Sequence, residues 1–266
     1  MKKITLFLST VLLFSNSALA NSNCFLAKEN NQIIKQEGQG DSCKLRHAPC
    51  STFKIAISLM GYNEGLLTDE THPELPFKEG YEDLVDVWKQ PHNPTTWIKN
   101  SCVWYSQIIT QKLGMTKFQD YVTKFHYGNQ NVSGDKGKNN GLSRSWLSSS
   151  LQISPQEQMQ FLEKLIGNKL PVSSKSHEMT KNILFVETLP GDWKFYGKTG
   201  AGDLFNNDGS FQDKQIGWFI GWIEKGSRII IFVNYIEDQN HKDYSAGKQA
   251  KEAARKKLLQ LVEDKD

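Results

Sequence analysis

A chain of 266 residues with 32 basic and 29 acidic side chains carries a formal net charge of only +3. This near-neutral balance argues against nucleic acid or an anionic membrane surface as a partner. The length and a hydrophobic content of 38% suit one globular unit, or two closely associated lobes, with an ample core.

The N-terminus has the pattern of a secretory signal peptide. Two lysines are followed by an apolar run from Ile4 to Phe14 and then by small residues up to Ala20. This predicts a signal peptide over residues 1–20, cleaved after Ala20, because the apolar run is too short to span a membrane. Residues 21–266 would then be one exported domain with 30 basic and 29 acidic residues, and no second long apolar segment predicts a membrane anchor.

The four cysteines bear on the compartment and on cross-linking. An oxidising compartment permits disulfides, and Cys43 and Cys50 are close enough in sequence to form a small loop, so we predict that this pair is bridged. The alternative is that all four remain reduced. Lipidation of Cys24 is disfavoured because Asn-Ser-Asn precedes it. The sequence has no C-x-x-C pair and its six histidines are scattered, so no metal site is expected.

The first half of the chain predicts a hairpin followed by helices. Residues 24–36 place two apolar pairs on either side of a polar turn, as in a β-hairpin. Residues 51–63 are apolar nearly all round and predict a buried helix. Residues 102–113 and 116–126 are amphipathic and predict two further helices.

The second half predicts one helix, then strands, then a terminal helix. Ser154-Pro155-Gln156-Glu157 is a capping box with proline at the first helical position. Residues 193–198, 215–224 and 227–235 are rich in aromatic and β-branched residues and predict strands. A charged helix over 245–262 closes the chain, and its basic run is expected to face solvent. This order predicts an α+β fold, in which helices flank a central antiparallel sheet and form an inserted helical lobe.

A serine and a lysine three residues apart open the predicted helix at 51–63. Residues at i and i+3 share a helix face, so Lys54 is expected beside the Ser51 hydroxyl. A serine hydroxyl is a poor nucleophile until a neighbouring base removes its proton. The pair alone is weak evidence, since Ser51 would also serve as an ordinary N-cap.

Four further motifs give this pair its meaning: Ser101-Cys102-Val103, Tyr127-Gly128-Asn129, Trp146-Leu147 and Lys198-Thr199-Gly200. In order and spacing the set resembles the class D serine β-lactamases, the oxacillinase type, over essentially all of residues 21–266. The resemblance implies a serine β-lactamase/transpeptidase-like fold and a catalytic domain over that range. It also implies a periplasmic hydrolase that opens β-lactam antibiotics and confers resistance, acting as a monomer or weak homodimer.

The resemblance also implies roles around the nucleophile. Ser51 would be acylated, with its backbone N–H and that of Ala201 forming an oxyanion hole. Lys54 would take up carbon dioxide, become N6-carboxylated, and act as general base for acylation and deacylation; no other cofactor is implied. Burial favours this because it disfavours the charged amine. The Trp146 indole N–H would hold the carboxylated lysine, and Val103 would supply an apolar wall. Core packing is the alternative role for both.

The remaining motifs would handle the leaving group and the substrate carboxylate. By the resemblance, Ser101 relays a proton to the lactam nitrogen and Lys198 adds positive charge beside it. Thr199 and Gly200 would belong to the carboxylate-binding element. The Tyr-Gly-Asn element is also read as a plain helix-ending turn, because glycine and asparagine tolerate left-handed backbone.

Two departures from related patterns stand out. No Ser-Asp-Asn element and no separate deacylating glutamate can be placed, which disfavours a class A enzyme. Many class D members have an arginine near the last strand that grips the substrate carboxylate, but residues 234–249 contain none. Ser245 would replace that contact in part, whereas Arg255 is expected to be a solvated charge.

Three other classes of function compete with hydrolysis. A β-lactam sensor would be acylated without turnover, but such receptors are normally tethered by a membrane segment. A cell-wall peptidase or transpeptidase shares Ser-x-x-Lys and Lys-Thr-Gly, although Trp146 and the Tyr-Gly-Asn element favour the class D enzymes. A purely structural exported protein would leave five coincident motifs unexplained.

Overall fold

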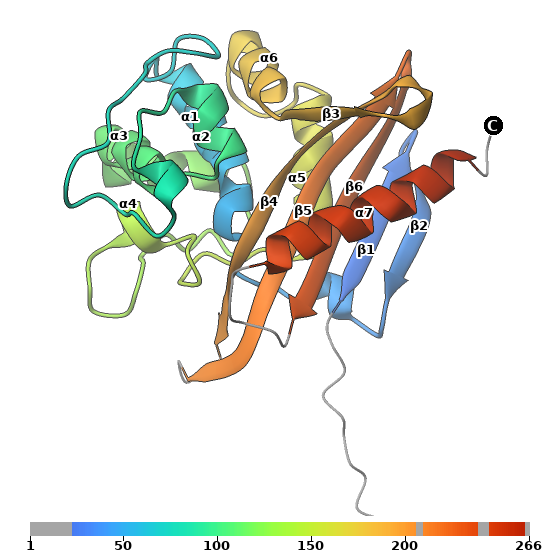
Figure 1. Cartoon of the computed structure of the whole chain (residues 1–266). Helices are drawn as coiled ribbons and strands as arrows, with labels where there is room; N and C mark the ends of the chain where they lie inside the picture. The colour runs from blue at the N-terminus through green and yellow to red at the C-terminus, as the bar shows by residue number, and fades with distance from the viewer. Residues whose placement is uncertain (1–22, 206–209, 239–244, 264–266) are drawn as a thin grey trace, which may run out of the picture.

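The computed structural model describes residues 23–205, 210–238 and 245–263. The predicted signal peptide therefore lies outside the described residues. Within them, one antiparallel sheet has the strand order β2-β1-β6-β5-β4-β3 (Figure 1). The strands are β1 (Cys24–Glu29), β2 (Gln32–Gly38), β3 (Phe185–Leu189), β4 (Trp193–Phe205), β5 (Phe211–Lys225) and β6 (Arg228–Asp238).

The predicted N-terminal hairpin is confirmed, and the structure adds its place in the sheet. Strand β1 pairs with β2 on one side and with β6 on the other, so the start and the end of the chain share one sheet. The terminal helix α7 (Ala246–Glu263) lies across one face of the sheet. Its buried side chains and those of the strands beneath form a second apolar core, separate from the main one.

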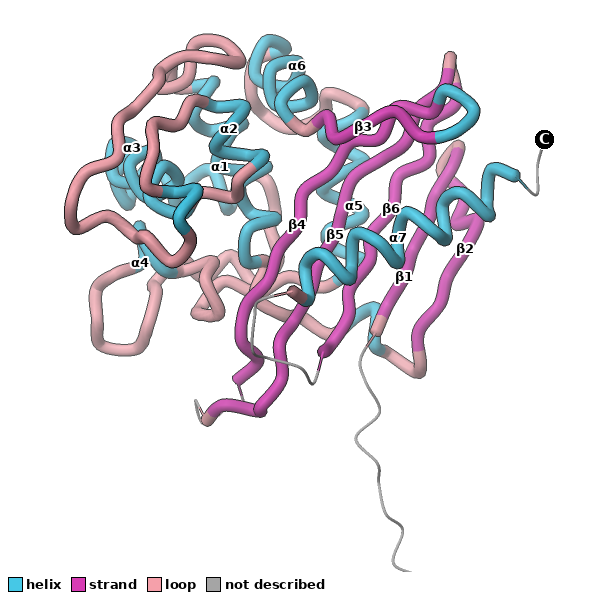
Figure 2. Tube along the Cα trace, viewed as in Figure 1, coloured by secondary structure: helices cyan, strands magenta, loops and turns pink. Residues whose placement is uncertain are grey.

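The other sheet face packs against α5 (Pro155–Ile166) and the helical lobe. The capping box before α5 forms as predicted: the Ser154 hydroxyl accepts from the Glu157 N–H and the Glu157 carboxylate accepts from the Ser154 N–H. Figure 2 shows that the lobe consists of helices joined by long loops. Its helices are α1 (Lys54–Asn63), α2 (Pro94–Lys99), α3 (Val103–Lys124), α4 (Gly141–Arg144) and α6 (Ser174–Ile183).

Two predicted helices differ in detail. The segment expected as one helix over 51–63 begins as a 3₁₀ turn, Cys50–Phe53, and becomes α-helical only at Lys54. The two helices expected over 102–113 and 116–126 follow each other within α3, separated at Gly114, where φ is 74° and ψ is 159°. Glycine adopts this left-handed φ without the steric cost that a side chain would add.

The predicted Cys43–Cys50 disulfide is wrong. Cys43 is bonded to Cys24, with Cα atoms 5.2 Å apart, and Cys50 is a free, buried thiol. The pairing follows from the fold, because the 3₁₀ turn Ser42–Lys44 packs against the start of β1. The chain then carries Cys50 towards β4, where an ideal Cβ on Gly202 would lie only 2.6 Å from its sulfur.

The Lys198-Thr199-Gly200 element lies in the middle of β4, whereas the strand expected over 193–198 ends at Lys198. Its three residues pair in turn with Ile220, Phe219 and Trp218 of β5, and the pairing continues to Gly202 and beyond. This central position brings the element beside the helical lobe. No helix of the described residues is both long and apolar enough to cross a membrane.

Candidate active site

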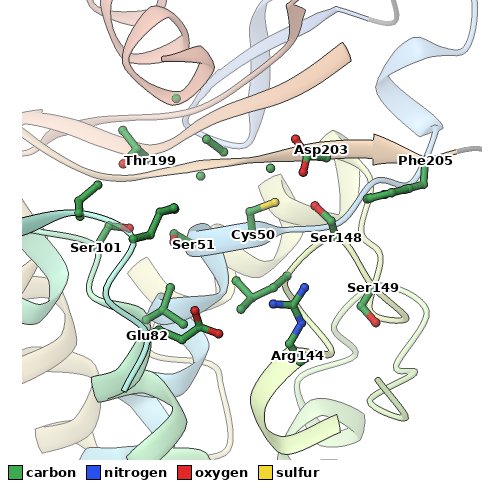
Figure 3. Close-up of a pocket in the computed structure, with 18 of the residues that line it drawn as sticks. Cys50, Ser51, Glu82, Ser101, Arg144, Ser148, Ser149, Thr199, Asp203 and Phe205 are labelled. Atoms are coloured by element: carbon green, nitrogen blue, oxygen red, sulfur yellow. The ribbon is translucent and has the colours of Figure 1, made fainter. Parts of the chain in front are cut away.

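A cavity of about 1000 Å³ separates β4 from the helical lobe. Figure 3 shows Thr199 and Asp203 on the strand that forms one wall, with Ser51 and Ser101 facing them from the other side. The cavity is lined by six residues that the sequence singled out: Ser51, Ser101, Val103, Thr199, Gly200 and Ala201. The structure therefore gathers motifs that are up to 150 residues apart in sequence.

Ser51 and Lys54 lie together as the i, i+3 spacing predicts. The Lys54 Nζ donates to the Ser51 Oγ at 2.9 Å, and the lysine side chain is fully buried. Burial disfavours the ammonium form and lowers the pKa of Lys54 to about 8. At physiological pH a far larger fraction of Lys54 is therefore in the neutral amine form than of an ordinary lysine. This amine lies within hydrogen-bond distance of the serine.

Trp146 lies in the loop after α4 and is fully buried. Its ring packs against Phe53 and Phe118, and its backbone carbonyl accepts from the Cys50 N–H at 3.0 Å. The indole Nε1 has no hydrogen-bond partner in the described part of the chain. A buried donor without a partner costs about 1–3 kcal/mol, so this N–H is available to an acceptor.

Ser101 and Lys198 form the second contact between distant motifs. The Lys198 Nζ donates to the Ser101 Oγ at 2.9 Å, to the Thr199 backbone oxygen at 3.0 Å and to the Thr199 Oγ1 at 3.3 Å. Burial, and then the positive charge of Lys54, hold the pKa of Lys198 well below its usual value. Ser101 itself has a left-handed φ of 56°, a strained conformation often found at functional sites.

Strand β4 approaches the turn that carries Ser51 very closely. An ideal Cβ on Gly200 would lie 2.9 Å from the Pro49 carbonyl oxygen and 3.1 Å from the Thr52 Cγ2. Glycine is therefore required at this position, because any side chain would push the strand away from the turn. Ala201, the next residue, lines the cavity beside Ser51.

The Tyr-Gly-Asn element packs behind the cavity. Tyr127 is fully buried and donates to the Gln158 Oε1 at 3.4 Å. The Asn129 side chain donates to the Ser150 carbonyl oxygen at 2.8 Å, and Gly128 has a φ of 53°. None of the three lines the cavity. Their contacts match the helix-ending turn and anchor the segment that follows Trp146.

Ser245 does not line the cavity, and its hydroxyl accepts from the Gln249 Nε2 at 3.0 Å. The first turn of α7, which follows Ser245, does reach the cavity, through Gly247 and Lys248. Sequence reasoning assigned Lys248 to a solvent-facing basic run and missed this position. The only signal was its nearness in sequence to Ser245, because contact with β4 depends on how α7 crosses the sheet.

Other cavity residues were also missed. Cys50 and Ser148 lie on the lobe side, and Glu82, Arg144 and Phe205 complete the walls that Figure 3 shows. Burial raises the pKa of the Cys50 thiol to about 12, so this cysteine is an inert packing group beside the serine. The described residues contain no group of three side chains that would hold a metal ion.

Comparisons with known proteins agree with this geometry. A family model described as the penicillin binding protein transpeptidase domain matches residues 15–259. β-Lactamase OXA-9 of Klebsiella pneumoniae is 40% identical over 79% of this chain and 77% of its own length. β-Lactamase OXA-1 of Escherichia coli is 41% identical over 80% of this chain and 74% of its own length.

Among solved structures, the class D β-lactamase OXA-427 aligns with a TM-score of 0.85 and 41% identity. The alignment covers 91% of this chain and 99% of the other. These similarities point to the same family as the fold does. The contacts of Ser51 with Lys54 and of Ser101 with Lys198 also fit that family. The chain therefore belongs to the penicillin-binding protein transpeptidase family and, within it, is a class D serine β-lactamase.

Proposed function

We propose that Ser51 opens the lactam ring by forming an acyl-enzyme, which water then hydrolyses. The Ser51 Oγ would bond to the lactam carbonyl carbon, the C–N bond would break, and the nitrogen would receive a proton. The contact between Lys54 Nζ and Ser51 Oγ at 2.9 Å supports this role, because it brings a base to the nucleophile. The backbone N–H groups of Ser51 and Ala201 would stabilise the oxyanion, a contribution worth about 10²–10³ in rate per donor.

The base is proposed to be Lys54 in its N6-carboxylated form. Carbon dioxide would add to the neutral amine with release of one proton. The carboxylated side chain would then supply an oxygen base, first for the Ser51 hydroxyl and later for the hydrolytic water. Two observations support this assignment: the lowered pKa of Lys54, and the buried Nε1 of Trp146, which has no hydrogen-bond partner among the residues that the structure describes. The apolar side chain of Val103 would limit solvent access.

The same modification bears on Lys198. Its pKa is lowered partly by the positive charge of Lys54, and a negative charge on Lys54 would reverse that contribution. A charged Lys198 would donate to Ser101, and Ser101 would pass a proton to the lactam nitrogen. The distance of 2.9 Å between Lys198 Nζ and Ser101 Oγ supports this relay.

The substrate carboxylate is proposed to bind beside Thr199 and Gly200, which line the cavity next to Lys198. Ser245 stays a prediction as the replacement for the missing arginine. Lys248 is a second candidate, because it lines the same part of the cavity and forms no ion pair with an acidic residue of the described ranges. The substrates are accordingly anionic β-lactams, and their hydrolysis would confer resistance.

We further propose that residues 1–20 are a signal peptide and that 21–266 form the catalytic domain in the periplasm, as a monomer or weak homodimer. The disulfide between Cys24 and Cys43 supports an oxidising compartment, because such bonds are rare in the reducing cytosol. Intact-mass measurement of protein recovered from the periplasm tests this. The mass of a chain beginning at residue 21 is expected, and a full-length cytosolic product would contradict it.

The observation that carries the mechanism is the contact between Ser51, which lines the cavity, and the buried Lys54, together with the buried Trp146 donor that has no partner among the described residues. Purified protein should hydrolyse a chromogenic cephalosporin over many turnovers, faster with added bicarbonate. With ¹³C-bicarbonate, wild-type protein should show a carbamate carbon resonance that Lys54→Ala lacks. A single stoichiometric burst would instead indicate a β-lactam sensor, and turnover without any carbamate signal would contradict carboxylation.

A further inference from the structure

A group of buried polar side chains lies directly beneath the nucleophile. The Gln158 Nε2 donates to the Thr52 Oγ1 at 3.0 Å, and the Gln158 Oε1 accepts from the Tyr127 hydroxyl at 3.4 Å. The Thr52 hydroxyl in turn donates to the Pro49 carbonyl oxygen at 2.7 Å. Gln158, Thr52 and Tyr127 are each at most 1% exposed, so water does not supply these contacts.

Gln158 is an unusual residue at this position of α5. Its buried neighbours on the helix are apolar, among them Met159, Phe161, Leu162 and Leu165. An amide placed in such surroundings is tolerated only if it is hydrogen-bonded. Gln158 meets this condition at both ends of its amide, because its nitrogen and its oxygen each have a partner. The amide therefore links α5 and the Tyr-Gly-Asn segment to the turn that holds Ser51.

The link ends where the turn touches β4. The Thr52 side chain and the Pro49 carbonyl are the atoms that an added Cβ on Gly200 would meet first, at 3.1 and 2.9 Å. The turn and the strand are therefore in direct contact at the residues next to Ser51 and Ala201, whose N–H groups we assign to the oxyanion hole. Any movement of Thr52 would change the separation of those two donors.

We propose that Gln158 is a positioning residue for acylation, acting through Thr52 to hold the Ser51 turn against β4. This inference rests on the proposed role of Ser51 as nucleophile. A shift of about 1 Å in a catalytic group costs on the order of 10²-fold in rate. Gln158→Leu removes both hydrogen bonds and puts an apolar side chain, one atom shorter, in place of the amide, so its acylation rate constant should fall at least tenfold while substrate affinity changes little.

The matched control is Gln160→Leu, which makes the same chemical change two residues along α5 at an exposed position. Its acylation rate constant should equal that of the wild type. Leu162→Ala controls for lost stability, because it opens the same core without touching the hydrogen bonds. All rates are measured by stopped flow at a temperature where each variant is fully folded by circular dichroism.

A double-mutant cycle tests the route through Thr52. Thr52→Val breaks the same bond from its other end, so the loss for the double variant with Gln158→Leu should be clearly less than the product of the two single losses. Thr52→Ser keeps the hydroxyl and should restore most of the rate. Independent effects, or a Gln158→Leu variant that loses stability but acylates normally, would overturn the inference. If Ser51→Ala were still acylated and active, the proposed function itself would fail.

Discussion

Replacing Trp146 with phenylalanine removes the indole N–H donor together with part of a buried ring. The indole is fully buried between Phe53 and Phe118, and a phenylalanine ring would retain most of that packing. In the wild type the donor has no partner among the described residues, so it is free to bind an oxygen of carboxylated Lys54. The variant therefore isolates the hydrogen bond that this mechanism requires.

The size of the effect follows from the burial of the donor. A hydrogen bond to a charged group contributes about 1.5–3 kcal/mol. Each 1.4 kcal/mol changes an equilibrium constant about tenfold. The bicarbonate concentration that gives half-maximal activity should therefore rise by about 10- to 100-fold in Trp146→Phe. Deacylation should slow more than acylation, since a weak base has to activate water without the help of the strained ring.

The assay is steady-state hydrolysis of a chromogenic cephalosporin across a bicarbonate series, together with the ¹³C carbamate signal. Trp97→Phe is the matched control, because Trp97 is equally buried but does not line the cavity. Its indole N–H donates to the Ser106 Oγ at a distance of 2.9 Å. That variant should lose stability and keep the wild-type bicarbonate dependence. The reasoning is refuted if Trp146→Phe needs no more bicarbonate than the wild type.

Three further outcomes are expected. With bicarbonate present, Lys54→Met should abolish activity. In buffer without carbon dioxide at pH 7, the same variant should raise the unfolding free energy by about 3 kcal/mol, because burial lowers the pKa of Lys54 from 10.5 to about 8 and each unit is about 1.36 kcal/mol. In the wild type the pKa of Lys54 is lower in the folded state than in the unfolded state. The destabilisation by the charged amine is therefore complete below pH 8 and fades towards pH 10.5. Urea titrations in which the stability difference between variant and wild type did not shrink over that range would contradict the assignment. Lys248→Met should raise KM for a penicillin about fivefold with little change in kcat, as expected for about 1 kcal/mol from an exposed charge, whereas Ser245→Ala should not, and the opposite result would assign the carboxylate to Ser245. Cys24→Ser should lower stability by about 3 kcal/mol in thermal unfolding and leave kcat unchanged at 25 °C; an unchanged midpoint would show that the bridge to Cys43 contributes nothing.

Local signals predicted most of the secondary structure. The capping box at Ser154, the N-terminal hairpin and the aromatic strands formed where expected, because caps, turns and side-chain alternation act within a few residues. Strand β3 and helix α6 were not predicted. Phe185 and Phe195 belong to neighbouring strands that pair around a short turn, and such pairing is a property of the sheet rather than of either segment.

The sequence did not predict which distant segments lie close together in the fold. Cys43 is seven residues from Cys50 but pairs with Cys24, because β1 runs past the Ser42–Lys44 turn. Lys248 appeared to be one charge of a basic run, yet the way in which α7 crosses the sheet brings it to the cavity wall. Both outcomes depend on how elements pack, which sequence spacing does not encode.

The chain itself determined the chemistry: a serine and a lysine one turn apart, with a second lysine motif and a tryptophan, specify acyl transfer by residue type and order. The fold alone decided the environment of these groups. It buries Lys54 completely, gives the Trp146 donor no partner within the described ranges and brings β4 into close contact with the nucleophile turn at Gly200. Desolvation and close contact arise only when distant segments pack together, and they turn an ordinary lysine into a base that can serve Ser51.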